Sequence, residues 1–189
     1  AVLHWEELTY SVVCREDDPQ LGGAIGETNR LIGQSLAAGL ARVGVQASVE
    51  RSGLPGPRPH GGQASIPCFS STARWEVTCA GRKLAGSAQR RFAGAVLQHG
   101  SLLTGPAHAR IVELLPGLSA AERDRWRSAL EARSIHLGAC GGAGVELDAL
   151  AEAVASGFAE VLGAALEVSR LEPAEQQLAV QLAAAGGDA

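Results

Sequence analysis

The sequence has no methionine, few aromatic residues and a single lysine, Lys83, among its 16 basic residues. Its net charge of −4 gives no basic excess, which a protein that binds nucleic acid or an anionic membrane would show. No apolar run reaches the ~18 residues that a membrane-spanning helix needs, and no signal peptide is recognisable. We therefore expect a protein that binds neither nucleic acid nor a membrane.

The sequence also lacks paired cysteines. Its four cysteines contain no C-x-x-C pair and no Cys/His cluster with zinc spacing, so we expect no metal site. Dispersed cysteines in a chain of this size are typical of reduced thiols in a cytoplasmic protein. The four are Cys14, Cys68, Cys79 and Cys140.

The remaining composition indicates one folded domain of the α+β class. Apolar residues make up 46% of the 189 residues and charged residues 19%, which is typical of a globular chain with a core. Residues 1–105 are expected to form a sheet-rich core with a mostly antiparallel sheet, and residues 106–189 a helical C-terminal part. Alternating apolar residues predict strands at 1–14, Val45–Val49, Trp75–Cys79 (with Trp75, Val77 and Cys79 inward), Arg82–Gln89 and Ala95–Leu103.

A helical apolar period predicts four helices. The first covers one sheet face with Ile32, Leu36 and Leu40. The second starts at a capping box, with Ser119 as N-cap and Glu122 three positions later. The predicted ranges are 24–43, 120–133, 147–166 and 172–185.

Cys68 and Lys83 are the first candidates for chemistry, although each has an ordinary explanation. A lone lysine is most often a solvated surface residue, and a cysteine beside a proline and a phenylalanine is most often a small buried apolar residue. A nucleophilic cysteine needs a nearby cation or base to raise its thiolate fraction. Lys83 lies across a hairpin-like return from Cys68 and is the candidate for that role, on a strand that we expect in the sheet interior.

The other candidates are equally ambiguous. Backbone N–H groups and the hydroxyl in Gly86-Ser87-Ala88 can cradle an oxyanion or a phosphate, but the same residues suit a β-bulge. His99 before Gly100 can be catalytic or a hydrogen-bonded packing residue. Cys14, Cys79 and Cys140 have no cation adjacent in sequence, and we interpret them as structural thiols.

Four motifs in a fixed order carry a resemblance to a known family. They are AVLHWEELTYSVV, PCF, GRKLAGSAQRR and LQHGSLL, and they span roughly residues 1–105. Together they resemble the biotin/lipoate A/B protein ligase superfamily, and most of all its cysteine-dependent octanoyltransferases. The resemblance implies a biotin-synthetase-like (class II synthetase-like) core for a single catalytic domain over residues 1–189.

The resemblance also implies a mechanism without a cofactor. Octanoyl would move from acyl carrier protein to Cys68 as a thioester, with Lys83 accepting the thiol proton. The lysine of a lipoyl domain or of the glycine-cleavage H protein would then take the octanoyl group as an amide. The substrate-binding residues that the motifs imply are His4, Gly86, Ser87, Ala88, Gln89, His99 and Gly100.

Three alternatives remain. An ATP-dependent lipoate-protein ligase shares the lysine motif but generally lacks the cysteine, so Cys68 disfavours it. An amidotransferase that moves octanoyl between two acceptor proteins uses a similar cysteine. A non-catalytic module that binds lipoyl domains is the third.

The first residues depart from the family pattern. Members carry an Arg-Arg-x-x-Gly-Gly segment just before A-V-L-H, and often an aspartate where this chain has Trp5. We therefore expect an N-terminally truncated domain with an open groove beside Cys68 and exposed apolar surface near His4 and Trp5. Because each buried methylene contributes ~0.8 kcal/mol, such a chain is expected to bind octanoyl donors weakly and to turn over slowly by itself.

Overall fold

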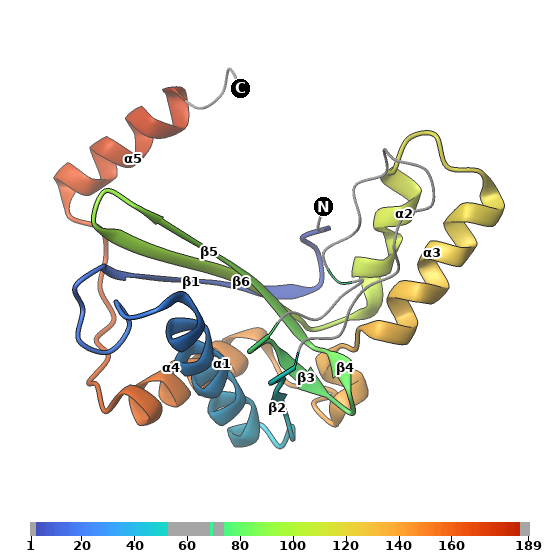
Figure 1. Cartoon of the computed structure of the whole chain (residues 1–189), viewed down its shortest axis with the longest axis horizontal. Coiled ribbons are helices and arrows are strands. Elements are labelled where there is room, and N and C mark those ends of the chain that lie inside the picture. The colour runs from blue at the N-terminus through green and yellow to red at the C-terminus, as the bar shows by residue number, and fades with distance from the viewer. Residues whose placement is uncertain (1–2, 53–68, 70–73, 186–189) are drawn as a thin grey trace.

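The computed structural model describes residues 3–52, 69 and 74–185. This part of the chain forms two antiparallel three-stranded sheets and five α-helices, which confirms the predicted α+β class (Figure 1). The strands are β1 (Glu7–Arg15), β2 (Ser48–Val49), β3 (Val77–Cys79), β4 (Arg82–Lys83), β5 (Ala85–Phe92) and β6 (Ala95–Leu103). The helices are α1 (Ile25–Arg42), α2 (Ile111–Leu114), α3 (Ala120–Arg133), α4 (Leu147–Leu162) and α5 (Pro173–Ala185).

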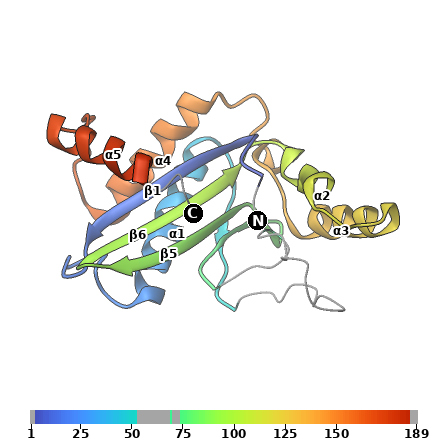
Figure 2. The same ribbon diagram turned by 90° about the horizontal axis from the view of Figure 1, so that it is seen from above.

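The larger sheet has the order β1-β6-β5, with β6 in the centre (Figure 2). β1 pairs with β6 along its whole length, from Glu7 opposite Leu103 to Arg15 opposite Ala95. β5 leads into β6 through a two-residue turn, Ala93-Gly94, in which both residues have positive φ. A turn of this kind matches the twist of paired strands, and here it fixes the register of β5 on β6.

The smaller sheet has the order β2-β3-β4, and a single residue, Leu84, separates the end of β4 from the start of β5. The predicted Ala80-Gly81 turn is confirmed, and both residues adopt positive φ (50° and 71°). The expectation that Lys83 lies on an interior strand is wrong, because β4 is the outermost strand of this sheet. Lys83 is nevertheless buried, since a parallel bridge to Ser134 covers its other side.

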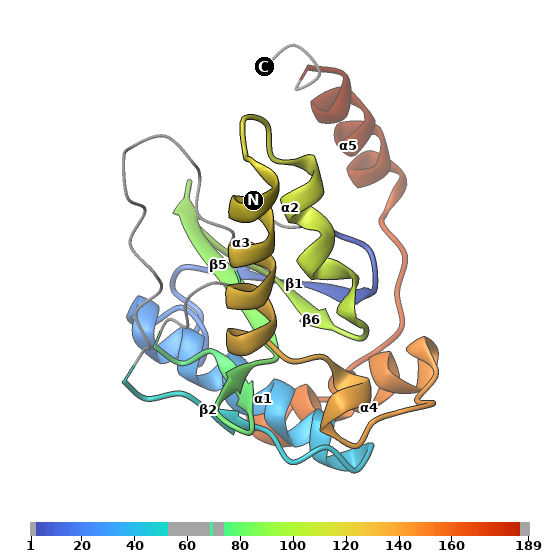
Figure 3. The same ribbon diagram turned by 90° about the vertical axis from the view of Figure 1, so that its right-hand side faces the viewer.

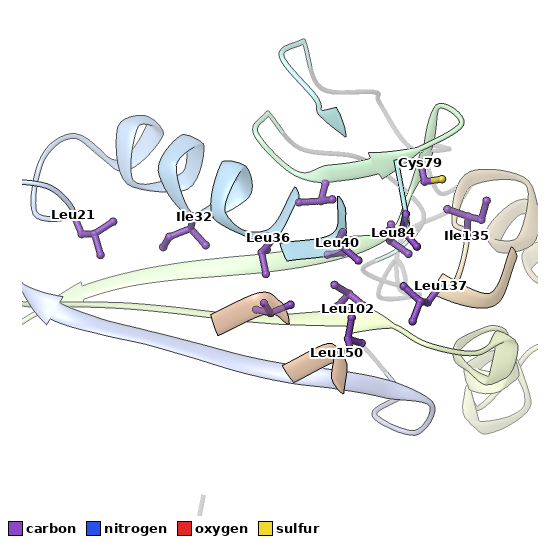
Figure 4. Close-up of a cluster of buried hydrophobic side chains, with 14 residues drawn as sticks. Leu21, Ile32, Leu36, Leu40, Cys79, Leu84, Leu102, Ile135, Leu137 and Leu150 are labelled. Atoms are coloured by element: carbon purple, nitrogen blue, oxygen red, sulfur yellow. The ribbon is translucent and has the colours of Figure 1, made fainter. Parts of the chain in front are cut away.

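Helices α1 and α4 cover one face of the larger sheet, as Figure 1 shows. The predicted contribution of Ile32, Leu36 and Leu40 is confirmed, because all three are almost fully buried. They meet sheet residues such as Leu102 and the α4 residue Leu150 in one continuous core (Figure 4). This main core therefore lies on the face under α1 and α4, and a second buried cluster joins Leu103 of β6 to Phe69 and to α2 and α3 through Val112 and Leu130.

The two helices pack backbone against backbone. A Cβ atom on Gly39 of α1 would lie 2.6 Å from the Cα of Val154, and one on Gly157 of α4 would lie 2.3 Å from the carbonyl oxygen of Ser35. Both distances are far below van der Waals contact. Glycine at both positions is therefore what allows the helices to approach this closely.

The remaining helices lie at the two ends of the larger sheet (Figures 1 and 3). The Ser119–Glu122 capping box is confirmed and starts α3, which packs with α2 at one end. The helix predicted over 147–166 ends earlier, at Leu162, because Gly163 adopts the left-handed conformation that closes a helix. Within the described residues, no helix has the length and apolar character to cross a bilayer.

Substituting Gly157→Ala should lower the free energy of unfolding by about 1–3 kcal/mol, because the methyl group forces α4 away from α1. This loss should exceed the gain of about 1 kcal/mol in helix propensity. Gly26→Ala in α1 is the matched control, since its Cβ would meet Trp75 at an ordinary 3.5 Å. Urea unfolding measures both variants, and equal stability of the two would contradict the proposed close packing.

Candidate functional site

Lys83 and Glu76 form a buried ion pair at the junction of the two sheets. The Lys83 Nζ lies 2.7 Å from Glu76 Oε1, and the two side chains are only 5% and 6% exposed. A buried carboxylate at this distance favours the charged ammonium form of a lysine. The single lysine of the chain is therefore a buried cation and not the solvated surface residue of the ordinary interpretation.

Glu76 is not among the site residues expected from the sequence, because only Trp75, Val77 and Cys79 of its strand were expected to point inward. In the structure, Glu76 and Thr78 are buried together with Val77 and Cys79. Lys83 lies directly opposite Thr78, so Glu76 is its diagonal neighbour on the same face of the small sheet. Diagonal pairs are within reach of long side chains. The signal available in the sequence was a carboxylate placed two residues before the partner of the only lysine.

Phe69 and Gly86 place the Lys83 amine beside the larger sheet. The Nζ atom lies 5.1 Å from the centre of the Phe69 ring. A Cβ atom on Gly86 would lie 2.8 Å from Lys83 Cε and 3.4 Å from Phe69 Cζ, so glycine leaves the space that both side chains use. Cys68, the predicted nucleophile, lies outside the described residues and directly precedes Phe69 in the chain.

His108 and Ser134 support Phe69 and β4 from the helical end of the molecule. The His108 and Phe69 rings are 5.7 Å apart, and His108 Nε2 lies 2.6 Å from Ser134 Oγ. Ser134 Oγ donates to the carbonyl of Leu130, so it accepts from an Nε2–H of His108. Burial lowers the pKa of His108, which keeps the ring neutral.

The predicted substrate-binding residues divide between the two faces of the larger sheet. The register places Gly86, Ala88 and His99 on the face that α1 and α4 do not cover. His4 joins this face, because its ring centre lies 6.3 Å from that of His99. Lys83 lies against Gly86, so the structure brings these residues together on one side.

Ser87, Gln89 and Gly100 lie on the opposite, helix-covered face. Ser87 and Gln89 both bond to Gln98, with Ser87 Oγ accepting from Gln98 Nε2 and Gln89 Nε2 donating to Gln98 Oε1. The Tyr10 ring lies over Gly100, where a Cβ atom would come within 2.5 Å of it. The side chains of Ser87 and Gln89 and the Cβ position of Gly100 therefore point into the helix-covered face, away from the face on which Lys83 packs against Gly86.

Glu7 is a further buried carboxylate that the sequence analysis missed. Its Oε1 lies 2.6 Å from His4 Nδ1, 2.7 Å from Thr9 Oγ1 and 2.9 Å from Ser101 Oγ. Burial alone would raise the pKa of Glu7, but the hydrogen bonds from His4, Thr9 and Ser101 outweigh it and lower the pKa. Glu7 is therefore ionised on the same face as His99.

Three of the four cysteines are described, and all are free thiols. Burial raises the pKa of Cys14, and burial together with the hydrogen bond that the Cys140 thiol donates to Cys79 raises the pKa of Cys140 to about 12. Raised values disfavour the thiolate, which agrees with a structural role. No cluster of three His, Cys, Asp or Glu side chains in the described ranges is arranged to hold a metal ion.

The exposure expected at the start of the chain is present at Trp5. Its side chain is 60% exposed, and the Arg110 guanidinium lies 4.7 Å from its ring centre. Trp5 also lines a shallow depression with Pro106, Ala109 and Arg127.

Comparison with known sequences gives one family and a consistent group of relatives. The profile described as the lipoyl protein ligase A/B catalytic domain matches residues 1–159. The octanoyltransferase LipM of Kyrpidia tusciae is 40% identical over 184 residues, covering 97% of this chain and 67% of the relative. The LipM of Symbiobacterium thermophilum is 36% identical over 96% of this chain and 65% of its own length. The chain thus spans about two thirds of these relatives.

Solved structures give the same fold. A bi-partite lipoate protein ligase from Thermoplasma acidophilum, described with its E2 lipoyl domain, superposes with a TM-score of 0.69 at 21% identity. It is covered over 59% of its length by 94% of this chain. A lipoate-protein ligase A bound with ATP gives a TM-score of 0.64 at 20% identity, over 94% of this chain and 60% of that structure. At these identities the similarity concerns the fold.

The buried ion pair can be tested by removing one charge and then both. Glu76→Gln deprives the Lys83 ammonium of its buried carboxylate and should lower the free energy of unfolding by about 3–5 kcal/mol. The double variant Glu76→Gln with Lys83→Met should lose less, because no charge then remains buried. Urea unfolding of both variants and of Lys83→Met alone gives the coupling free energy. Additive losses would contradict a direct pair.

The lowered pKa of Glu7 predicts a specific dependence of stability on pH. Because the folded state holds this pKa below its ordinary value of 4.5, the stabilisation is present above that pH and is lost as the pH falls through the folded-state value. The stability difference between wild type and Glu7→Gln should therefore shrink below about pH 4.5. Thermal unfolding from pH 7 to pH 3 measures it, and a constant difference would refute it.

Proposed function

The chain belongs to the lipoyl protein ligase A/B catalytic domain family, and from this membership we propose that it is a protein N-octanoyltransferase of lipoate synthesis. The resemblance to the biotin/lipoate ligase superfamily is thereby confirmed, as is the fold expected from it. The activity rests on similarity to LipM octanoyltransferases over nearly the whole chain.

The observation that carries the proposal is the position of Lys83 between Gly86 and Phe69. A buried cation that touches the residue after Cys68 is what a reactive thiol needs, because a nearby positive charge favours the thiolate. We propose Cys68 as the nucleophile on the strength of its peptide bond to Phe69 and of the family motif.

The first half-reaction transfers octanoyl to the protein. The Cys68 thiolate attacks the thioester carbonyl of octanoyl–acyl carrier protein, and the pantetheine thiolate leaves. A lysine of a lipoyl domain or of the glycine-cleavage H protein then attacks acyl-Cys68, and the product is an amide. An amide is more stable than a thioester, so the transfer proceeds without ATP.

The ion pair with Glu76 refines the role of Lys83. The sequence analysis predicts that Lys83 accepts the thiol proton, which requires a neutral amine. Because the buried carboxylate favours the ammonium, we propose that Lys83 acts as a fixed cation that stabilises the thiolate and the developing oxyanion.

Gly86 and Ser87 are the two candidates for the backbone N–H that binds the oxyanion, and the strand pairing favours one of them. Leu103 N–H donates to the carbonyl of Leu84, and hydrogen-bonded pairs alternate along antiparallel strands. Gly86 therefore directs its N–H toward β6, whereas Ser87 directs its N–H to the outer edge of β5. We propose the Ser87 N–H as the donor.

Partners and boundaries remain proposals as well. A lipoyl-domain acceptor fits the related ligase from Thermoplasma acidophilum, which is described with its E2 lipoyl domain, and acyl carrier protein fits the chemistry of the donor. A single catalytic domain over 1–189, with its sheet-rich and helical parts, is also proposed. The cytoplasmic location stays a prediction.

Acylation of Cys68 is the direct test. The chain is incubated with excess octanoyl–acyl carrier protein, long enough for a slow reaction to accumulate, and its intact mass is measured. Wild type and the control Cys14→Ala should gain one octanoyl group that hydroxylamine removes, whereas Cys68→Ala should gain none. Acylation of Cys68→Ala would refute the nucleophile.

The same assay separates the alternatives. Octanoate incorporation that depends on ATP and magnesium would indicate the ligase. An octanoylated H protein that serves as donor in place of acyl carrier protein would indicate the amidotransferase. Binding of a lipoyl domain without any acylation would indicate the non-catalytic module.

Gly86→Ala should slow acylation by about 10-fold or more, because the new methyl group displaces the end of the Lys83 side chain. The loss of stability should be smaller than for Glu76→Gln, since the methyl group shifts the end of Lys83 but leaves its carboxylate partner in place. Single-turnover acylation and urea unfolding are measured on the same preparation. An unchanged rate would show that Lys83 is not positioned through Gly86.

A further inference from the structure

Glu7 and His4 form a second pair of polar groups beside the proposed acyl site. The Glu7 side chain is only 3% exposed, whereas that of His4 is 54% exposed. Glu7 Oε1 accepts hydrogen bonds from His4, Thr9 and Ser101. The other carboxylate oxygen, Oε2, is buried and has no hydrogen-bond partner among the described residues. The pair therefore joins a buried carboxylate to an imidazole that reaches solvent.

The contacts of Glu7 fix the tautomer of His4. The carboxylate is ionised and can only accept hydrogen bonds, so the His4 Nδ1 at 2.6 Å carries the proton. In the neutral ring the other nitrogen, Nε2, is then unprotonated. A carboxylate that orients an imidazole in this way prepares it to act as a base.

The His4 imidazole lies beside β6, and the Lys83 amine packs against the neighbouring strand β5. His4 Nδ1 lies 3.5 Å from Ser101 Oγ, and Ser101 is the register partner of Gly86, against which Lys83 packs. Adjacent strands are about 4.8 Å apart. Leu3, the residue before His4, packs against the cluster that contains Phe69. The His4 ring and the residue that follows Cys68 thus lie at the same part of the open sheet face.

The transfer to an acceptor lysine needs a base that the proposed first half-reaction does not supply. A lysine side chain is an ammonium ion at neutral pH and must lose a proton before it can attack. The Lys83 amine is already paired with Glu76 Oε1 at 2.7 Å and is assigned to the first half-reaction, so we look for this base elsewhere. The ring centre of His99 lies 6.3 Å from that of His4. Its Nδ1 lies 3.2 Å from the Ser11 hydroxyl, so a hydroxyl and not a carboxylate contacts that nitrogen.

We infer that His4, oriented by Glu7, is the general base that deprotonates the acceptor lysine in the second half-reaction; this rests on the proposed octanoyl transfer. His4 Nε2 takes one proton from the ammonium group, and the neutral amine attacks the acyl-Cys68 carbonyl. The C–N bond forms and the C–S bond breaks. The second amine proton ends on the Cys68 sulfur, and His4 releases its proton to solvent. Glu7 is a positioning residue.

The test compares two nucleophiles on the preformed acyl-enzyme. A lipoyl-domain lysine is protonated at neutral pH and needs the base, whereas hydroxylamine is largely unprotonated and does not. His4→Asn keeps an N–H group for Glu7 but has no base, and Glu7→Gln removes the orienting charge. For each variant, the rate of transfer to the lysine and the rate of reaction with hydroxylamine are measured on the acyl-enzyme that has already formed. A slower acylation step therefore does not affect either rate.

In both variants, transfer to the lipoyl-domain lysine should fall about 100-fold, while the reaction with hydroxylamine stays within about 2-fold of wild type. Raising the pH toward the ordinary pKa of lysine should restore part of the loss, because free amine then forms without a base. Glu6→Gln is the matched control, since it removes the adjacent carboxylate, whose Oε2 accepts from the Ala107 N–H. Its ratio of the two rates should equal that of wild type.

Two results would overturn the inference. Equal slowing with both nucleophiles would show that His4 and Glu7 have only a structural role, and no slowing with lysine would show that another group is the base. A wild type that forms no acyl-Cys68 would refute the proposed function and this inference with it. The mass measurement that precedes the transfer step distinguishes that case from the other two.

Discussion

A lysine and a glutamate buried together constrain the whole junction between the two sheets. Removing two charges from water costs several kcal/mol per ion, and the cost is offset only when the pair is close and further bonded. That requirement holds β4 beside the segment before β3, and it keeps the Lys83 amine against Gly86 and Phe69. The carboxylate also fixes where the amine lies, and so which groups the amine can reach.

The two faces of the larger sheet have different roles: the face under α1 and α4 carries packing residues, and the other face carries the proposed site. On the face under α1 and α4, Gln98 joins Ser87 and Gln89 in a hydrogen-bonded network, and Tyr10 fills the space above Gly100. On the other face, Glu7, Ser101 and Gly86 lie at nearby register positions, and His4 contacts Glu7 and Ser101. Because successive side chains of a strand point to opposite faces, one continuous motif contributes residues to both faces. The GRKLAGSAQRR motif is therefore partly scaffold.

Local signals in the sequence were sufficient for much of the fold. The capping box at Ser119, the apolar period of α1 and the Ala80-Gly81 turn each depend on residues a few positions apart, and all three are confirmed. The role of Glu76 depends on strand register, which the sequence leaves open, and the same holds for β4 as an outermost strand. Glu7 was missed for a related reason: its partners Ser101 and His4 meet only once β1 lies on β6. Cys68 lies outside the described residues, so its role stays a prediction.

The backbone contact between α1 and α4 also bears on the order in which the protein can fold. The contact joins a helix near the start of the chain to one near its end, with the strands β2 to β6 between them in sequence. Contacts between distant segments require closing a long loop and form slowly. On the ribosome, the side of α1 that meets α4 therefore stays uncovered until α4 has emerged. During that interval only the β1–β6–β5 sheet can cover Ile32, Leu36 and Leu40.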